Sequence, residues 1–552
     1  MSAATTAGPA PNRMLWDGRW IEAPAPHPVA GSALIEVELT APLAALGPAH
    51  DRVLERPLRK AASFALTDGP RAAVRKIASK RAEGGMSGDY HLILAHGRRD
   101  GERVVALVPR APRCAALILA PEALVRPAPA DLDRDRFAAI AAMLRAQAPA
   151  LGPLLRQSYL YSATAPPPAL VAALTDALAA AAPTPAAPTP ELLTPPVPGG
   201  GGETLALGPP PASPRAPLAL LGAGDYVRIE VAPALAGAGL ARAVIADREP
   251  QIAALAAAEL GFAAATSDAA GAIDSLDRRG VVVVATAHDS HAALAAVALD
   301  AGHRVLCEKP ALVTHADLDR LEAAAGRHPG ELEIGFNRRH PPLVERARRM
   351  LATEPGPATI IALIREVEIT ADHWYLWPNQ GTRVAGNLCH WIDLAFHLLG
   401  PGPRAVEVAV SPRVSDDPRD ADAERAFTIT FDDGSVATLM PTTRGDSVRG
   451  VQEQIEIRRG GLALRLDDLW RLNGLRRGLP VRHRTLWRGK GHGPMYRSAI
   501  KRFAAGDAAA YPAADLRRVG EVQLAATEAV RSGAAAAPIA DLLAAGRARE
   551  AG

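Results

Sequence analysis

The sequence Leu218-Ala219-Leu220-Leu221-Gly222-Ala223-Gly224 is a short apolar run that ends in a pair of glycines. A helical pattern follows it. A strand-to-helix turn of this kind lets the backbone approach a pyrophosphate, and the helix N-terminus supplies amide donors and a positive dipole. A simple tight turn explains two glycines equally well, and Val227 stands where the third glycine of the dinucleotide fingerprint is expected. The surrounding pattern must therefore decide between the two interpretations.

Apolar runs and helical patterns alternate on the carboxyl side of this turn. Val281-Val282-Val283-Val284 is apolar at every position, as in a parallel strand that helices cover on both faces. Repeated strand–helix units predict a doubly wound, Rossmann-type parallel sheet within an α/β fold. Strands are predicted at 218–221, 243–246, 281–285, 304–307 and 332–335, and helices at 249–260, 290–301 and 316–325.

After about His340 the pattern becomes that of an α+β domain with a mostly antiparallel sheet. Asp432-Asp433-Gly434 and Gly460-Gly461 are typical of hairpin turns between strands. A helical tail is expected from about Met495 through Arg531. A sheet with one apolar face needs a cover, so such a domain favours a homo-oligomer. The strands are predicted at 358–365, 406–410, 427–431 and 436–440.

A segment rich in proline and glycine precedes the glycine turn. Twelve prolines lie between Pro183 and Pro217, with four consecutive glycines at 199–202. Proline removes backbone donors and glycine adds chain entropy, so an extended, exposed linker is expected at 183–216. The predicted domains are therefore an N-terminal domain at 1–182, a dinucleotide-binding domain at 217–340 and a substrate or oligomerisation domain at 341–552.

The N-terminal domain shows no catalytic constellation. Strands are predicted there at 33–39 and 104–108, and helices at 137–144 and 170–181. From its residues alone it is a small α/β or β-rich domain.

The composition excludes several classes of function. The chain has 552 residues, of which 48% are hydrophobic and 22% charged, so most of it can build buried cores. A formal net charge of only +3 argues against nucleic acid or an anionic membrane as the main partner. No signal peptide or membrane span is recognisable. Cys114, Cys307 and Cys389 are too few and too scattered for a disulfide framework or a zinc site, so a cytoplasmic protein without a metal is expected.

Two charged residues follow the second predicted strand of the sheet. Asp247 comes 25 residues after Gly222, where an acidic side chain can accept hydrogen bonds from the adenosine ribose of a dinucleotide. Arg248 could instead pair with a 2′-phosphate and so favour NADP. A solvated turn that caps the next helix explains Asp247 equally well.

A lysine stands at the end of another predicted parallel strand, in Cys307-Glu308-Lys309-Pro310. Open α/β sheets bind ligands in the crevice at these strand ends. The chain has 62 basic residues, and Lys309 is one of only six lysines among them. An ammonium can share a proton with a substrate hydroxyl, whereas a guanidinium cannot. The alternative is an ordinary surface lysine before a turn proline.

A third group lies on a predicted helix. His390, Asp393 and His397 are spaced by three and four residues, which places them on one helical face. His390 could act as a general base, with a carboxylate fixing its tautomer. The same array could suggest a metal, but no further ligand spacing supports one.

Taken together, these residues resemble the Gfo/Idh/MocA family of nicotinamide-dependent sugar oxidoreductases, over about Pro217 to Gly533. The resemblance is carried by Ala285-Thr286-Ala287-His288-Asp289-Ser290-His291, Glu308-Lys309-Pro310 and Gly335-Phe336-Asn337-Arg338-Arg339.

One branch of this family is similar at Asp372-His373-Trp374-Tyr375 and Cys389-His390-Trp391-Ile392-Asp393. In that branch an alcohol-dehydrogenase-like portion precedes the sugar oxidoreductase, often in polysaccharide biosynthesis. Leu66-Thr67-Asp68-Gly69 through Ser79-Lys80 and the segment 114–127 are similar to fragments of that portion, which would make residues 1–182 a reduced remnant.

The resemblance implies an enzyme that uses NAD or NADP on a hydroxyl or keto group of a sugar, sugar nucleotide or cyclitol. Lys309 would hold the reacting hydroxyl and His390 would exchange its proton, while hydride moves to or from the nicotinamide. The implied cofactor-binding residues are Gly222, Ala223, Gly224, Asp225, Tyr226, Asp247, Arg248, Thr286, His288, His291, Glu308 and Lys309. The implied substrate-binding residues are Asn337, Arg338, Arg365, His373, Tyr375 and Asp393.

The sequence also departs from the family pattern. Gly386 stands where an acidic residue is common, Asn387 stands where the branch has Glu, and Gln380-Gly381-Thr382 replaces a glycine-rich run. Asparagine can orient a histidine but cannot stabilise imidazolium with a charge. With Val227, these changes support a competing hypothesis, a non-catalytic nucleotide-binding scaffold or regulatory protein.

Overall fold

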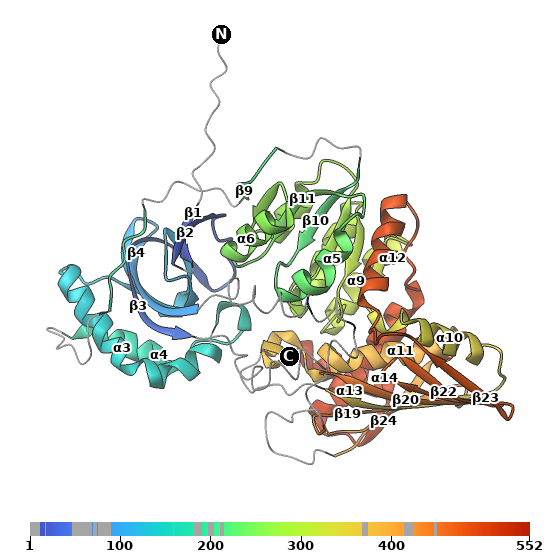
Figure 1. Cartoon of the computed structure of the whole chain (residues 1–552). Coiled ribbons are helices and arrows are strands. Elements are labelled where there is room, and N and C mark those ends of the chain that lie inside the picture. Colours follow the sequence, from blue (N-terminus) through green and yellow to red (C-terminus); the bar gives the residue numbers. More distant parts are fainter. Residues whose placement is uncertain are drawn as a thin grey trace, which may run out of the picture.

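The computed structural model of the chain describes residues 12–16, 18–46, 69, 74, 90–157, 159–180, 190–196, 204–209, 215–366, 374–412, 424–445 and 450–551. The described strands form sheets of three, five, seven and nine strands (Figure 1). The described part of the chain contains no helix that is both long and apolar enough to cross a membrane.

The seven-stranded sheet has the doubly wound order β15-β14-β13-β10-β11-β12-β9. Its first parallel strand, β10, lies in the middle and pairs with β11 on one side and β13 on the other. Successive strands are therefore added on one side of β10 and then on the other. Ligands bind at such a switch point, outside the carboxyl ends of the strands. The strands are β10 (Pro217–Leu221), β11 (Ala241–Ala246), β12 (Ala264–Thr266), β13 (Val281–Val284), β14 (Arg304–Cys307) and β15 (Leu332–Ile334).

The seventh strand comes from the predicted linker. β9 (Thr204–Ala206) pairs antiparallel with β12 at the edge of the sheet. In the same segment, Leu193 forms a bridge with Thr40 of the N-terminal domain. Parts of 183–216 are therefore extended but paired, because backbone donors and acceptors at a sheet edge need partners.

Helices cover both faces of this sheet, which is why every residue of β13 is buried. One face packs against α6 (Pro250–Leu260) and α5 (Ala232–Leu235), and the other against α7 (Ala269–Asp274), α8 (His291–Asp300) and α9 (His315–Arg327). Helix α12 (His492–Ala505) follows eight of the nine strands of the nine-stranded sheet in the sequence, yet its Met495, Tyr496 and Phe503 join the core on the α5 and α6 side. The chain thus returns to the dinucleotide-binding sheet late in its course.

The nine-stranded sheet has the order β23-β22-β21-β20-β16-β19-β18-β17-β24 and is antiparallel except for the pair β16–β19. Helices α10 (Pro342–Leu351), α11 (Cys389–Leu399) and α13 (Ala513–Ser532) pack on one face. The strands are β16 (Ala358–Arg365), β17 (Ala405–Val410), β18 (Phe427–Phe431), β19 (Val436–Thr442), β20 (Gln452–Arg459), β21 (Leu462–Asp467), β22 (Arg471–Arg476), β23 (Leu479–Arg484) and β24 (Ala536–Pro538).

The other face of this sheet is open along β16, where exposed and buried residues alternate. Ile361 and Leu363 are large apolar side chains that point to this open face.

The helical tail differs from the expected single stretch. Gly506 ends α12 and Gly533 ends α13, each in the left-handed conformation that favours glycine. The tail does not stop at Arg531: it continues through β24 into α14 (Ile539–Ala551).

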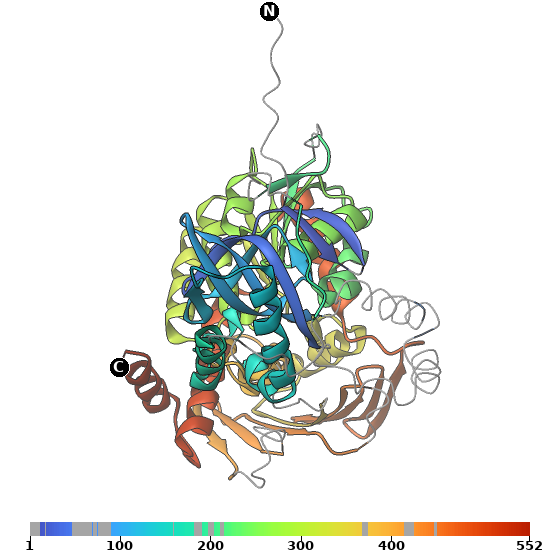
Figure 2. The same cartoon turned by 90° about the vertical axis from the view of Figure 1, so that its left-hand side faces the viewer.

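The N-terminal domain is β-rich, as expected. Its sheets have the orders β7-β3-β4-β5-β8 and β2-β1-β6, and α3 and α4 cover the larger one. Figure 2 looks onto this domain, with the dinucleotide-binding helices behind it. The elements are β1 (Asn12–Trp16), β2 (Arg19–Ala23), β3 (Ser32–Leu46), β4 (Tyr90–Arg99), β5 (Glu102–Ala111), β6 (Cys114–Ala115), β7 (Leu117–Pro121), β8 (Val125–Pro127), α3 (Arg134–Gln157) and α4 (Pro168–Ala179). Of the family-like segment 66–80, all but Gly69 and Val74 lie outside the described residues.

Candidate active site

The glycine turn has the geometry of a phosphate-binding loop. Gly222 has φ +92°, and a Cβ there would lie 2.2 Å from the Ala285 carbonyl oxygen, so only glycine fits. A Cβ on Gly224 would meet no described atom within 4 Å, which leaves open space over the turn. The helix begins with Asp225 and Tyr226. The turn can therefore accept a pyrophosphate against its backbone.

Val227 replaces the third glycine without disturbing this turn. Its side chain is buried in the core on the α5 and α6 side of the sheet. The helix widens here into a π-helical turn, Val227–Val231, before it continues as α5. The Val227 side chain therefore packs into the core and does not lie on the phosphate-binding side of the turn.

Asp247 ties the second strand to the glycine turn. Its Oδ2 accepts the backbone N–H of Ala223 at 2.8 Å, and its Oδ1 accepts that of Glu249 at 2.9 Å. Burial raises the pKa of Asp247 and these two hydrogen bonds oppose the rise. The carboxylate thus both caps the turn before α6 and lies beside the phosphate-binding loop.

Lys309 lies at the carboxyl end of β14 and reaches toward α11. Its Nζ donates a hydrogen bond to the Gly386 carbonyl oxygen at 3.0 Å. Burial works against the charged ammonium, but its electrostatic interactions with Tyr375, Cys389 and Glu308 raise the pKa of Lys309 above its usual value. The ammonium therefore stays protonated at neutral pH and acts as a donor.

The neighbouring carboxylate of Glu308 is buried beneath the turn. Burial raises the pKa of Glu308 to about 7. The Tyr496 hydroxyl donates to Glu308 and lies 2.9 Å from the hydroxyl of Tyr226. Gly335 makes room, because a Cβ there would lie 2.5 Å from Glu308 Oε1. The cluster joins the glycine-turn helix, β14 and α12.

His390 is the second residue of α11 and is buried. Burial, together with the positive charges of Arg338 and Lys309, holds the pKa of His390 well below its usual range. Its Nδ1 has no hydrogen-bond partner among the described residues. The imidazole is therefore neutral at physiological pH, the state in which a ring nitrogen can accept a proton.

Three of the predicted substrate-binding residues have hydrogen-bond or ion-pair partners within the protein. Asn337 Nδ2 donates to the Lys490 carbonyl oxygen at 2.6 Å. Arg338 is paired with Glu453 at 2.7 Å. Asp393 is fully buried and accepts from Arg339 Nε at 2.8 Å. These side chains hold elements together, and the sequence motif could not show it because each partner lies far along the chain.

The other predicted substrate-binding residues have different outcomes. Tyr375 lies beside Gly386 at the crevice. Arg365 ends β16 and donates to the Thr443 carbonyl oxygen at 3.4 Å. His373 lies outside the described residues.

The segment after β13 is braced by its own polar side chains. Thr286 Oγ1 lies 2.7 Å from Ser290 Oγ. The ring nitrogens of His291 lie 2.8 Å from the Pro310 carbonyl oxygen and 3.1 Å from that of Thr286. His291 therefore fixes the loop that carries Lys309, and its ring is buried.

The presence of glycine at position 386 has a structural explanation. A Cβ there would lie 3.0 Å from the Tyr375 ring and 3.1 Å from the His288 ring. The two ring centroids are 4.7 Å apart. Aromatic rings thus fill the space in which the family commonly places an acidic side chain.

A carboxylate is nevertheless present close by. Glu366 is buried, and it accepts hydrogen bonds from Arg383 and, at 3.2 Å, from Asn387 Nδ2. Sequence reasoning missed Glu366 and Tyr496. The position of Glu366 directly after a predicted strand was the only signal for it, and nothing near Tyr496 in the sequence pointed to Glu308.

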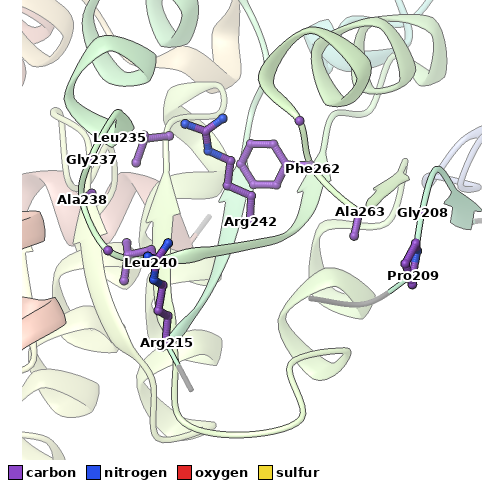
Figure 3. Close-up of a pocket in the computed structure, with 12 residues that line it drawn as sticks. Gly208, Pro209, Arg215, Leu235, Gly237, Ala238, Leu240, Arg242, Phe262 and Ala263 are labelled. Atoms are coloured by element: carbon purple, nitrogen blue, oxygen red, sulfur yellow. The ribbon is translucent and has the colours of Figure 1, made fainter. Parts of the chain in front are cut away.

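A pocket of about 500 Å³ lies away from this site, at the amino ends of β11 and β12 (Figure 3). None of the predicted site residues lines it. Its walls are Gly208, Pro209, Arg215, Leu235, Gly237, Ala238, Gly239, Leu240, Arg242, Gly261, Phe262 and Ala263.

Residues 217–336 match the model of the Gfo/Idh/MocA oxidoreductase family, described as an NAD-binding Rossmann fold. These residues are a Gfo/Idh/MocA domain. The Gfo/Idh/MocA domain contains the glycine turn, Asp247 and Lys309. The match confirms the predicted family for this domain, and its description agrees with the predicted nicotinamide dinucleotide cofactor.

Two curated relatives are dehydrogenases of sugar-type compounds. Levoglucosan dehydrogenase of Pseudarthrobacter phenanthrenivorans is 32% identical over 171 residues, which are 29% of this chain and 43% of the relative. Inositol 2-dehydrogenase 2 of Saccharopolyspora erythraea is 34% identical over 182 residues, 33% of this chain and 51% of the relative. The chain thus spans about half the length of the curated relatives it matches.

Solved structures share the fold over a longer stretch. An oxidoreductase domain protein from Kribbella flavida has a TM-score of 0.51 at 22% identity and covers 59% of this chain and 99% of its own. Levoglucosan dehydrogenase in complex with NADH and L-sorbose has a TM-score of 0.51 at 20% identity, over 59% of this chain and 98% of its own. The match confirms the Rossmann-type sheet followed by an α+β domain.

Proposed function

We propose that the protein is an NAD- or NADP-dependent oxidoreductase that moves hydride between the nicotinamide and a CH–OH group of a sugar or cyclitol. The observation that carries the proposal is the hydrogen bond from Lys309 Nζ to the Gly386 carbonyl oxygen. It brings the lysine at a parallel strand end to the segment that leads into His390, so two groups suited to proton transfer meet beside the dinucleotide crevice.

The chain fits the cofactor at its glycine turn. Gly222 allows the backbone approach, and the space over Gly224 is open. When bound, the dinucleotide supplies the hydride acceptor or donor. Asp247 lies next to the turn, where its carboxylate can bind the adenosine ribose.

Two residues divide the work on the substrate. The protonated Lys309 donates to the substrate oxygen and stabilises the negative charge that develops there as the hydroxyl proton leaves. Neutral His390 accepts that proton on a ring nitrogen. Carbon-bound hydrogen leaves as hydride, and the oxygen becomes a carbonyl. In the reverse direction His390 returns the proton.

The substrate class rests on the relatives, which are named for levoglucosan and inositol. The proposal that the substrate is a sugar nucleotide of polysaccharide biosynthesis rests on the resemblance of residues 372–375 and 389–393 to one branch of the family. Three buried free cysteines suit a reducing compartment such as the cytoplasm. The open apolar face of the nine-stranded sheet favours a homo-oligomer.

The test is titration with NADH and NADPH, followed by turnover on sugars, cyclitols and sugar nucleotides. Lys309→Ala should bind cofactor like the wild type but lose turnover by at least about a hundredfold. Lys501→Ala, at an exposed lysine, is the control. Turnover that is unchanged in Lys309→Ala, or cofactor binding without turnover on any such compound, would favour the scaffold hypothesis.

A further inference from the structure

The N-terminal domain is fixed against the dinucleotide-binding sheet through α6. Ala254 of α6 lies in the same core as Met14, Ala23 and Ile35 of the N-terminal domain. On the other side, Trp16 joins the core that contains Ile252 and Ala257 of α6. One helix is therefore shared between two domains, and the N-terminal domain lies against the α6 side of the dinucleotide-binding sheet (Figure 1).

From that position the N-terminal domain touches the carboxyl ends of two neighbouring strands. At the end of β11, the Arg248 guanidinium carbon lies 4.1 Å from the Tyr161 ring centroid, and the Tyr161 hydroxyl donates to the Arg248 carbonyl oxygen at 3.2 Å. At the end of β12, Ser267 donates to the Ala25 carbonyl oxygen. These strand ends flank the adenosine half of a dinucleotide site.

A bridge extends the contact to a third strand and to the second domain. Asn379 Nδ2 donates to the Tyr161 carbonyl oxygen at 2.9 Å and to Asp289 Oδ2, after β13, at 2.7 Å. Tyr159 is buried and packs edge-on against Tyr161, with ring centroids 4.9 Å apart, and against Trp377 at 6.0 Å. The turn at 159–162 thus joins all three parts of the molecule.

We propose that the N-terminal domain completes the cofactor site: the turn at 159–162 closes the adenosine end of the crevice, and Tyr161 is a positioning residue for Arg248. The inference rests on the proposed dinucleotide binding. Stacking on Tyr161 limits the rotamers of Arg248, so its positive charge is held at the strand end where the adenosine ribose and its phosphates bind. A cofactor enclosed in this way leaves slowly, because the Asn379 bridge must open first.

The experiment uses the full-length protein and two probes, NADH followed by its fluorescence and ADP-ribose as a displacing ligand. Tyr161→Ala should weaken both about three- to tenfold, the effect expected when one cation–π contact is lost. Tyr161→Phe keeps the ring and should stay within about twofold of the wild type. Arg471→Ala, which removes a guanidinium 4.5 Å from the Trp470 ring outside the cofactor site, is the matched control and should change neither.

Asn379→Ala gives a second, milder variant. It leaves Tyr161 and Arg248 in place and cuts the bridge, so NADH should dissociate about three- to tenfold faster in stopped-flow mixing. If Tyr161→Ala does not fold, this measurement carries the test. Wild-type affinity in folded Tyr161→Ala, or a wild-type dissociation rate in Asn379→Ala, would overturn the inference. A wild-type protein that binds neither NADH nor NADPH would overturn the proposed function itself.

Discussion

At the scale of single residues, the two glycines of the turn are glycine for different reasons, which a sequence motif cannot distinguish. Gly222 is required by the backbone, since its φ is +92° and a Cβ would collide with the Ala285 carbonyl oxygen. Gly224 has no such constraint from its described surroundings. The described fold therefore does not require the second glycine, whereas the proposed pyrophosphate site does.

This difference gives a matched pair of variants. Gly222→Ala should lower the free energy of unfolding by about 2–4 kcal/mol, because it combines a strained conformation with a backbone clash. Gly224→Ala should leave stability within about 1 kcal/mol but weaken NADH binding, because the methyl group occupies the space of the pyrophosphate. Chemical denaturation and NADH titration measure the two effects. Equal NADH affinity in Gly224→Ala and the wild type would contradict the assignment of this space.

Glu308 is a buried residue whose negative charge the fold opposes. Its pKa is raised to about 7 from the usual 4.5, first by burial. A raised carboxyl pKa means that the folded state favours the proton. The stability that this provides is complete below pH 4.5 and is lost as the pH rises toward and through 7.

Glu308→Gln should therefore flatten the pH dependence of stability. Between pH 5 and pH 8 the free energy of unfolding should fall by about 1–3 kcal/mol less in the variant than in the wild type. Glu249, whose pKa burial also raises to about 7, keeps part of the slope in both proteins. Glu407→Gln, at an exposed carboxylate, should behave as the wild type. Denaturation at a series of pH values makes the comparison, and parallel curves for Glu308→Gln and the wild type would refute the expectation.

At the scale of elements, helix α11 is fixed in place by buried ion pairs. Asp393 accepts from Arg339, which also lies 2.9 Å from Asp515 of α13. Burial raises the pKa of Asp393 and the charge of Arg339 opposes the rise. The helix that carries His390 is thereby fixed to α13 and to the segment after β15.

Removing this carboxylate should affect folding before chemistry. Asp393→Ala leaves Arg339 with one buried partner fewer and should cost about 3 kcal/mol of stability. Asp432→Ala, which removes a surface pair with the mostly exposed Arg404, should cost much less stability. Thermal unfolding of the two variants tests the contrast. A stable Asp393→Ala protein that loses only substrate affinity would restore the substrate-binding role predicted from sequence.

How far the sequence predicts each element depends on the range of the interactions involved. The strands of the dinucleotide-binding sheet follow local hydrophobic runs, so β10, β13 and β14 lie at or within a residue of their predicted bounds. Lys309 and Gly222 could be predicted as site residues because the residues next to them in the sequence indicate their roles. Tyr161 and Tyr496 were not, because each reaches the site by a long-range contact that leaves no local pattern. Glu366 had only its place after a predicted strand as a signal.

At the scale of the whole molecule, the domains share more structure than the proline-rich segment suggests. β9 comes from that segment and covers the edge of β12, and α6 has cores on both of its sides. A shortened chain that begins at residue 217 would expose both an unpaired sheet edge and the apolar side of α6.

Such a chain, 217–552, should aggregate or melt at a lower temperature than the full chain. Light scattering and calorimetry of the two proteins provide the measurement. Separate transitions for the N-terminal and dinucleotide-binding domains in the full chain would show that α6 does not couple them, whereas one shared transition is expected.

The return of α12 to the first sheet has a mechanical consequence. The chain crosses between the two sheets after β15, again before α12 and once more after it. Two bodies tethered once can swivel freely, but bodies tethered at three points have few axes left about which to turn. Any opening that admits a substrate must therefore be a small tilt about these three connecting segments. The reacting groups then return to the same alignment each time the domains close.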